Sequence, residues 1–433
     1  MIRTSIVASA IGVAMSTAAF AQTEITWWHA MGGQLGETVN EVANMFNESQ
    51  SEYQITPIYK GGYEDTLTAT IAAFRAGEHP NVVQVFDAGA ATIIGAAGAV
   101  IPAEDLFAQT NTPFDANDYI PGVRSFYADS TGKMVGMPFN SSTPILYYNV
   151  EALTAAGVEP PATWEEFETI APALVEAGYV PLAQSHSPWI MTENFHSRHD
   201  LPFATNNNGF DGADGAQLLV NNDAIKTHFT KMKEWLDKGW YGYYGAGWGD
   251  NQTPFENGEV AMWLGSSASF GGLRNSTDFE FSATFLPYWE AISPEPVSTF
   301  IGGAALFAMS GHDDAENAGA AEFFRFLSSA DVQKFWHMET GYVPITQAAY
   351  DLTAESGYYA EVPQAEVGTK QLTIAEGEHN AGYRLGFYVQ IRDVMNREYG
   401  RIFAGETDVE TAFAVIEEEG NRLLERFAQT ATN

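Results

Sequence analysis

The chain has 433 residues and no cysteine, and its 20 Lys and Arg stand against 55 Asp and Glu, for a formal net charge of −35. This balance argues against a nucleic-acid-binding surface, which needs clustered basic residues, and against attachment to anionic lipid. Without disulfides the fold depends on its hydrophobic core, and the length is too great for one core and indicates two large lobes.

The first 21 residues have the order of a secretory signal peptide. Arg3 is the positive start, residues 6–18 are a short apolar stretch, and 19–21 (A-F-A) form a small-x-small cleavage site. No later stretch is apolar for long enough to span a bilayer. The sequence therefore predicts export to the bacterial periplasm and a mature chain that starts at Gln22.

The next segment alternates between strand and helix patterns. Strands are predicted at 24–29, 53–59 and 81–87, and apolar residues at helical spacing predict helices over 35–46 and 67–74. This β-α-β-α-β order is the unit of a parallel, doubly wound sheet. Because ligands of such sheets lie beyond the carboxyl ends of the strands, we expect a binding site near residues 29–31, 61–63 and 87–89.

A polar stretch at 138–149 (P-F-N-S-S-T-P-I-L-Y-Y-N) comes before a second α/β pattern. Its second half, 145–148, has the β-branched and aromatic character of a strand. The amide and hydroxyls of 140–143 are expected outside the core, because burying them without partners is costly. We interpret the stretch as a polar crossing that brings neutral hydrogen-bonding groups to the edge of a cleft.

The second pattern continues to the end of the chain. Thr163 and Glu166 form the signature of a capped helix start. A strand at 260–264 leads into a serine-rich loop, 318–336 reads as two short helices, and apolar residues over 416–427 share one face of a final helix. No repeat and no long low-complexity linker interrupts this pattern.

Two constellations have the residue types of metal sites. His196 and His199 are three apart, but no cysteine or second carboxylate pair completes a site, so we expect an exposed polar patch. Residues 206–214 have the composition of a calcium loop without its ligand spacing, which favours a turn-rich loop. We therefore expect neither a metal nor a cofactor.

A series of short motifs gives the chain a family resemblance through nearly all of its mature length. It resembles the extracellular solute-binding proteins of ABC importers, the group that includes the maltose-binding proteins, and most of all the branch that binds sn-glycerol 3-phosphate. The motifs are W-W-H-A-M-G at 27–32, Y-K-G-G-Y at 59–63, A-A-F-R-A-G at 72–77, the stretch 138–149, N-N-G-F-D-G at 207–212, I-G-G-A at 301–304, T-G-Y-V-P-I-T at 340–346 and Q-I-R at 390–392.

The resemblance implies an α/β fold of two lobes joined by a hinge, with the ligand clamped in the cleft between them. Lobe 1 would comprise 22–137 plus about 290–345, and lobe 2 would comprise 138–289 plus about 346–433. The protein would act as a monomer that hands its ligand to the transmembrane subunits of an ABC permease.

The family's ligand site, carried over by position, falls on Tyr63, Asp87, Ser142, Trp189, Ser266, Gly303, Tyr342 and Arg392. In this interpretation Arg392 gives a bidentate contact to a phosphate, and Asp87 accepts a polyol hydroxyl. Ser142 and Ser266 add donors, the aromatic residues pack on carbon faces, and Gly303 permits close backbone approach. The chain departs from the family by having Asp87 in place of Glu and by its segment 241–250.

Taken one at a time, these residues have simpler interpretations. Ser266 is equally suited to capping a helix, Arg392 to a surface ion pair, and the aromatic residues to core packing. Asp87 is the least ambiguous, because it follows a buried strand of an α/β unit.

The ligand expected from the resemblance is glycerol 3-phosphate or a glycerophosphodiester, and an anion would need strong local recognition against the acidity of the whole chain. The alternative is a neutral sugar or oligosaccharide, since the Trp-rich and Tyr-rich segments permit stacking on sugar rings. A secreted hydrolase with paired carboxylates is a third hypothesis, although no pair of acids is singled out by its setting.

Overall fold

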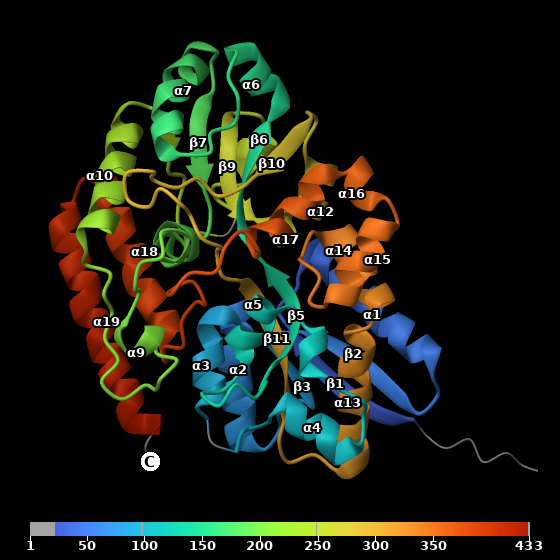
Figure 1. The fold of residues 1–433 in the computed structure, drawn as a ribbon. Helices are drawn as coiled ribbons and strands as arrows, with labels where there is room; N and C mark the ends of the chain where they lie inside the picture. The colour runs from blue at the N-terminus through green and yellow to red at the C-terminus, as the bar shows by residue number, and fades with distance from the viewer. Residues whose placement is uncertain (1–21, 97, 248, 432–433) are drawn as a thin grey trace, which may run out of the picture.

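The protein is described by a computed structural model that covers residues 22–96, 98–247 and 249–431. The predicted signal peptide lies outside these residues. Figure 1 shows two α/β lobes, one above the other, each built around its own sheet. Among the residues described, no helix is both long and apolar enough to cross a membrane.

The first lobe contains the predicted β-α-β-α-β unit, which is confirmed. The parallel strands β1, β2 and β3 are joined by α1 and α2, and every residue of β3 is buried, as expected for a strand covered on both faces. β11 pairs antiparallel with β3, and β5 pairs antiparallel with β11, so the sheet is mixed. The sheet has the order β2-β1-β3-β11-β4 with β5 paired to β11, and its strands are β1 (Thr23–His29), β2 (Tyr53–Tyr59), β3 (Val82–Phe86), β4 (Val100–Ile101), β5 (Met137–Ser142) and β11 (Gly302–Met309).

Helices cover this first sheet and bury an aromatic core against it. Trp27 of β1 lies between Phe139 and Phe323, with ring centroids 5.4 and 5.2 Å away. The helices are α1 (Gly33–Ser49), α2 (Tyr63–Ala76), α3 (Asp87–Ile94), α4 (Ala103–Thr110), α5 (Pro121–Arg124), α13 (Asp314–Leu327) and α14 (Ala330–Thr340), with 3₁₀ turns η1 (Ala116–Asp118) and η2 (Ser125–Tyr127).

The second lobe has a five-stranded mixed sheet in the order β10-β6-β9-β7-β8. Thr163 caps α7 in a capping box with Glu166, as the sequence predicts. The strands are β6 (Pro144–Asn149), β7 (Val180–Gln184), β8 (Tyr241–Gly242), β9 (Val260–Ser266) and β10 (Phe281–Thr284). The helices are α6 (Val150–Ala156), α7 (Trp164–Glu176), α8 (Asn194–Arg198), α9 (Thr205–Asn208), α10 (Asp223–Asp237), α11 (Thr253–Glu256) and α12 (Phe270–Ser276), with the π-helical segment η3 (Pro188–Glu193) and the 3₁₀ turn η4 (Ser267–Ser269).

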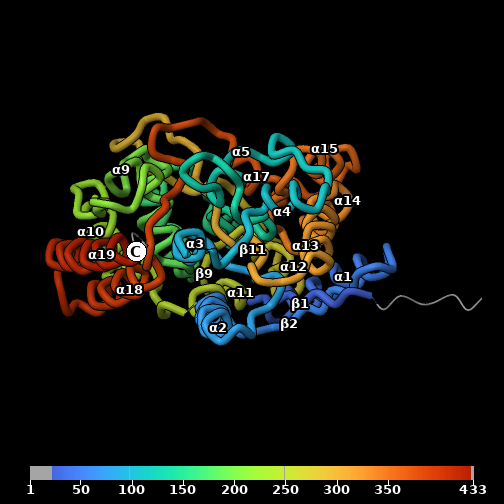
Figure 2. Tube along the Cα trace, turned by 90° about the horizontal axis from the view of Figure 1, so that it is seen from below, coloured from blue at the N-terminus to red at the C-terminus, as the bar shows by residue number. Residues whose placement is uncertain are grey.

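The C-terminal helices flank both lobes. α18 lies along α19 and also contacts α3 of the first lobe, as Figure 2 shows from below. The predicted final helix is confirmed as α19. These elements are α15 (Gln347–Glu355), α16 (Tyr358–Glu361), η5 (Pro363–Glu366), α17 (Val367–Gln371), α18 (Tyr388–Ala404) and α19 (Val409–Ala431).

The polar stretch at 138–149 is two strands that belong to different sheets. The chain passes from the first sheet to the second at Thr143, between β5 and β6, and returns between β10 and β11. The lobe boundaries expected from the sequence place these crossings near 137 and near 290. The division into lobes that the sequence suggests otherwise stays a prediction.

The polar half of this stretch is buried, so the expectation that it lies outside the core was wrong. Asn140, Ser141 and Thr143 are fully inaccessible, and Ser142 is nearly so. Partners replace water at Asn140 and Thr143, whereas the buried hydroxyl of Ser141 has no hydrogen-bond partner among the described residues. Asn140 is bonded at both ends of its amide, and Thr143 Oγ1 donates to the carbonyl of Gly368 at 3.0 Å.

The two histidines at 196 and 199 are also buried, and the expected exposed patch was wrong. His196 contacts Thr192 O through Nδ1 and the Asn222 side chain through Nε2. His199 contacts Phe195 O, and its Nε2 accepts from Trp289 N. Each ring therefore has partners for both nitrogens, which accounts for two polar rings in a core. Residues 206–214 form a turn-rich segment, as predicted.

Candidate functional site

A cavity of about 530 Å³ lies where the carboxyl ends of strands from both sheets meet. Segments that directly follow β1, β2 and β3 line it from the first lobe, and the segment after β7 and the end of β9 line it from the second, as expected for α/β sheets. The structure brings all eight predicted site residues to this cavity: Tyr63, Asp87, Ser142, Trp189, Ser266, Gly303, Tyr342 and Arg392. That they bind a ligand stays a prediction.

A buried group of three charges, which we call the ionic clamp, forms one wall. Arg392 of α18 donates from Nη1 and Nη2 to the two oxygens of Asp87, at 3.0 and 3.1 Å. It also donates from Nε and Nη2 to the two oxygens of Glu193, at 2.8 and 2.7 Å. The clamp thus joins α3, the end of the π-helical segment, and α18.

The clamp carries two carboxylates against one guanidinium. Burial lowers the pKa of Arg392, but the charges of Asp87 and Glu193 overcome this and hold it well above its ordinary value. Burial raises the pKa of Glu193, against the opposing charge of Arg392. The prediction from the sequence was that Arg392 makes a bidentate contact to phosphate. In the structure its guanidinium is hydrogen-bonded to the carboxylates of the protein. The alternative of a surface pair does not hold either, since the Arg392 side chain is only 16% exposed.

A second buried polar group beside the cavity is neutral, and we call it the amide relay. The main-chain N–H of Ala30 donates to Gln84 Oε1 at 2.7 Å. Gln84 Nε2 donates to Asn140 Oδ1 at 2.8 Å, and Asn140 Nδ2 donates to the hydroxyl of Tyr63 at 2.9 Å. Tyr342 lies within hydrogen-bonding reach of Tyr63. Burial, and then the neighbouring Tyr342, raise the pKa of Tyr63 well above its ordinary value, so both phenols are neutral.

Gly303 is required by the backbone where β11 meets β5. Its φ is +94°, and a Cβ there would lie 1.9 Å from the carbonyl oxygen of Asn140. Ser142, the last residue of β5, pairs with Gly302. The glycine therefore allows β11 to approach β5 closely enough to bring Ser142 to the cavity.

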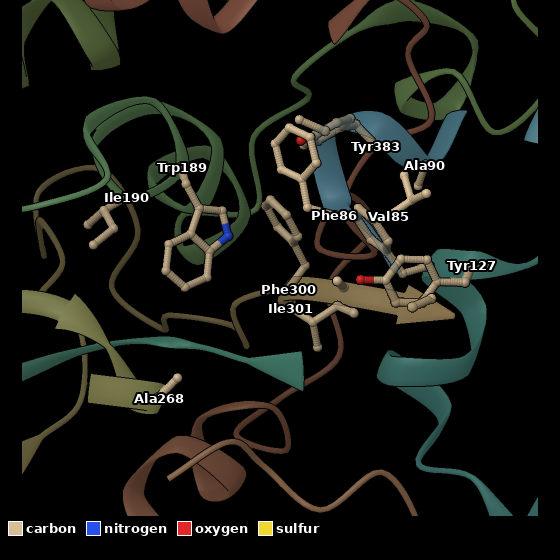
Figure 3. Close-up of a cluster of buried hydrophobic side chains, with 14 of the residues drawn as sticks. Val85, Phe86, Ala90, Tyr127, Trp189, Ile190, Ala268, Phe300, Ile301 and Tyr383 are labelled. Atoms are coloured by element: carbon tan, nitrogen blue, oxygen red, sulfur yellow. The ribbon is translucent and has the colours of Figure 1, made fainter. Parts of the chain in front are cut away.

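Trp189 enters the cavity from the π-helical segment that follows β7. Such segments are rare and frequent at functional sites. A Cβ on Gly302 would lie 2.5 Å from the indole, so this glycine makes room for the ring. Figure 3 shows Trp189 and Ile190 on one side of the apolar wall and Phe86, Tyr127 and Tyr383 on the other. Over the part of the chain that the structure describes, the buried Trp189 Nε1 has no hydrogen-bond acceptor.

Ser266 has the capping role that its sequence allowed. Its Oγ accepts from the N–H of Ala268 at 3.2 Å, at the start of the turn that follows β9. Its hydroxyl proton is left for another acceptor, because capping uses only a lone pair of the oxygen. The residue therefore lines the cavity and caps the turn at once.

Sequence reasoning missed several groups at the cavity. Glu193, which completes the clamp, lies between Thr192 and Asn194 and carries no signal of its own. His186 lines the cavity, and burial followed by the charge of Arg392 lowers its pKa to about 3, so it is neutral. Two further acids that line the cavity were also missed. Glu64 lies in the first turn of α2, and Asp393 directly follows Arg392 in α18. No group of three or more metal-ligating acids, histidines or cysteines occurs within 22–96, 98–247 and 249–431.

Two α/β lobes with a cavity between the edges of their sheets define a two-lobed solute-binding protein. A family model described as bacterial extracellular solute-binding protein matches residues 41–366. The chain belongs to this family.

Curated relatives match the chain over nearly its whole length. The sn-glycerol-3-phosphate-binding periplasmic protein UgpB of Yersinia enterocolitica is 39% identical over 99% of this chain and 98% of its own. The protein of the same name from Brucella abortus strain 2308 is 38% identical over 98% of each chain. The family resemblance stated from the motifs is thus confirmed.

Solved structures share the fold. UgpB from Mycobacterium tuberculosis in complex with glycerophosphocholine matches with a TM-score of 0.78 at 23% identity, over 94% of this chain and 99% of that one. The maltose-bound MalE3 of T. maritima matches with a TM-score of 0.75 at 18% identity, over 93% of this chain and 100% of that one. The predicted two-lobed α/β fold class is confirmed.

Proposed function

We propose that the protein is the periplasmic binding component of an ABC importer that captures sn-glycerol 3-phosphate or a glycerophosphodiester and delivers it to the membrane permease. The observation that carries the proposal is the single cavity lined by all eight residues of the expected site. The identity to the UgpB relatives supports the same ligand class. Export by residues 1–21, action as a monomer and the absence of catalysis are parts of this proposal.

The clamp and the neutral donors divide the cavity between the two parts of such a ligand. Asp87, held by Arg392, is suited to accept a glycerol hydroxyl. A phosphate beside the clamp would face two carboxylates and one guanidinium, so it is better held by neutral donors. Those donors are the hydroxyls of Ser142, Ser266, Tyr63 and Tyr342 and the indole N–H of Trp189.

The charges of the lining favour a diester over a monoester. Glu64, Asp87 and Asp393 line the cavity with Arg392 as the basic partner, and His186 is neutral. A phosphomonoester carries up to two negative charges near neutral pH, whereas a diester carries one, and a cationic head group would cancel that one. The electrostatic cost of entering this cavity is therefore smaller for the diester.

Titration calorimetry on the mature protein tests the proposal. We expect binding of glycerophosphocholine and of glycerol 3-phosphate, with the diester tighter, and no binding of maltose. Binding of maltose without either glycerol ligand would overturn the ligand class in favour of a sugar. Mass spectrometry of ligand released on denaturation identifies what the protein carries, and hydrolysis of an incubated diester would contradict the proposal that it is not an enzyme.

A further inference from the structure

We propose that Gln84 and Asn140, neither of which lines the cavity, fix the direction of the hydrogen bonds at Tyr63 and Tyr342 so that this pair of phenols faces the ligand as a donor. The inference rests on the proposed function for the identity of the ligand, and it adds two positioning residues to the site. It makes the two tyrosines selective for an acceptor-rich group such as a phosphoryl oxygen.

The direction is set at one end of the relay by the main chain. The N–H of Ala30 can only donate, so the Gln84 atom that faces it at 2.7 Å must be the carbonyl oxygen. The Gln84 amino group then faces Asn140 and requires an acceptor there, at 2.8 Å. Both side chains are fully buried, so water does not offer an alternative partner.

The same reasoning carries the direction to the cavity. With its oxygen bonded to Gln84, Asn140 turns its amino group to the Tyr63 oxygen, at 2.9 Å. Tyr63 therefore accepts from Asn140 and donates its own proton elsewhere, to Tyr342 or to the ligand. Because Tyr63 and Tyr342 hold two protons and share at most one between them, at least one O–H is directed away from the pair. The Tyr342 hydroxyl donates to Met31 Sδ at 3.9 Å, and because this sulfur lines the cavity and is a weak acceptor, a phosphoryl oxygen can take its place.

If the hydrogen bonds of the relay ran in the opposite direction, the number of phenol protons left for the ligand would change. An Asn140 oxygen facing Tyr63 would take the Tyr63 proton, and Tyr342 would then donate to Tyr63. The pair would offer the ligand lone pairs in place of a proton. The amides thus decide whether the phenols attract or repel a phosphoryl oxygen, although neither amide contacts it.

Gln84→Glu reverses the relay from a distance. Because burial raises the pKa of a carboxyl group, binding is measured above the pH at which the new side chain ionises. The carboxylate still accepts from Ala30 N but has no proton for Asn140, so the Asn140 amide turns and its oxygen faces Tyr63. We expect the dissociation constant for glycerophosphocholine, measured by calorimetry, to rise about 10- to 100-fold, the range for losing one hydrogen bond to a charged group. Gln184→Glu, a buried glutamine outside the relay whose amino group has no partner among the described atoms, is the control for the added charge.

A double-mutant cycle distinguishes the effect of Gln84→Glu on the relay from the effects of its added charge and of a disturbed fold. In a Tyr63→Phe background the direction of Asn140 has no phenol to act on, so Gln84→Glu should change the dissociation constant by less than about twofold. An equal loss in both backgrounds, or an unchanged affinity of folded Gln84→Glu, overturns the proposal.

A measurement without ligand keeps the relay independent of the proposed function. In the unliganded wild-type protein with labelled asparagine, we expect a nuclear Overhauser effect between the Asn140 amide protons and the ring of Tyr63, weakened by Gln84→Glu. Its absence from the wild type overturns the relay even if the variant fails to fold. If the protein binds neither glycerol ligand, the proposed function fails, and this signal still decides the relay.

Discussion

The ionic clamp and the amide relay are two solutions to burying polar groups beside one cavity. The clamp joins three segments of the chain, at Asp87, Glu193 and Arg392, and the relay joins four, at Ala30, Gln84, Asn140 and Tyr63. The clamp holds charges and runs from α3 to α18. The relay holds dipoles and stays within the first lobe. The difference indicates that the clamp fixes elements to one another, whereas the relay fixes the orientation of protons.

The clamp and the relay also differ in what remains when one side chain is truncated. Truncation in the clamp leaves a buried charge without its partner, whereas truncation in the relay leaves a buried dipole without its partner. The unpaired charge costs more stability.

The largest expected effect on stability comes from acid. Several buried histidine rings are neutral, like the side chains of the relay, and acid adds a positive charge to them. A free histidine has a pKa near 6.5, and burial lowers the pKa of His228 to about 3 and that of His199 to about 4. The unfolded chain therefore takes up protons at higher pH than the folded one. Stability is complete above pH 6.5 and is lost as the pH falls toward 4, by up to about 1.4 kcal/mol per pH unit for each such histidine.

Thermal unfolding between pH 7 and pH 4 measures this loss. His228→Gln should reduce the dependence of the unfolding midpoint on pH by the contribution of one histidine. His379→Gln, at a partly exposed position, is the control. The histidines whose pKa values burial lowers are His29, His186, His196, His199, His228 and His337. A wild-type midpoint that does not change from pH 7 to pH 5 would contradict the expectation.

Removing the centre of the clamp should be the next largest effect. Arg392→Ala leaves Asp87 and Glu193 side by side without their counter-charge, and we expect a loss of about 3–5 kcal/mol in the free energy of unfolding. Urea denaturation measures it. Arg422→Ala breaks a pair with Glu418 in which both side chains are about two-thirds exposed, and it should cost under about 1 kcal/mol. Equal losses in the two variants would remove the distinction between clamp and surface pair.

Gly303→Ala should disturb the relay through the backbone. The positive φ strains the alanine, and its Cβ would overlap the Asn140 carbonyl oxygen at 1.9 Å, so we expect a loss of about 2–3 kcal/mol. Gly157 also has a positive φ, +68°, but a Cβ on this residue would meet no atom within 4 Å, so Gly157→Ala should cost only about 1 kcal/mol. Chemical denaturation of the two variants isolates the overlap, and similar losses would show that β5 adjusts freely.

The smallest expected effect is that of interrupting the relay. Asn140→Leu leaves the buried Gln84 amino group without an acceptor, which should cost about 1–3 kcal/mol of stability. The same denaturation experiment measures it beside Arg392→Ala. A loss larger than that of the arginine variant would reverse the ranking of clamp and relay.

The sequence predicts much of the fold because local pattern and tertiary structure agree there. The nearly continuous apolar run of β3, the capping box at Thr163 and the helical spacing of α19 each determine an element without knowledge of the rest. Residues 140–143 were misjudged because their burial depends on partners up to 225 positions away, such as Gly368 for Thr143. No local pattern contains such a partner.

The candidate site shows the same limit. Motif resemblance located all eight residues at one cavity, but it did not indicate what they bond to in the folded chain. Arg392 was assigned a phosphate because the family resemblance places a site arginine there, and Glu193 could not be paired with it from spacing alone. Gln84 was hidden inside a strand pattern, where its polarity looked like a minor interruption.

The position of β11 in the first sheet has a consequence for the synthesis of the chain. β11 lies between β3 and β4 and is the partner of β5, yet it begins at Gly302, more than two hundred residues after β3 ends. The first lobe therefore cannot complete its sheet on the ribosome until about two-thirds of the chain has emerged. Such long-range pairing folds slowly. Slow closure would suit the proposed export, because a chain that crosses a membrane in extended form must not fold before it has crossed.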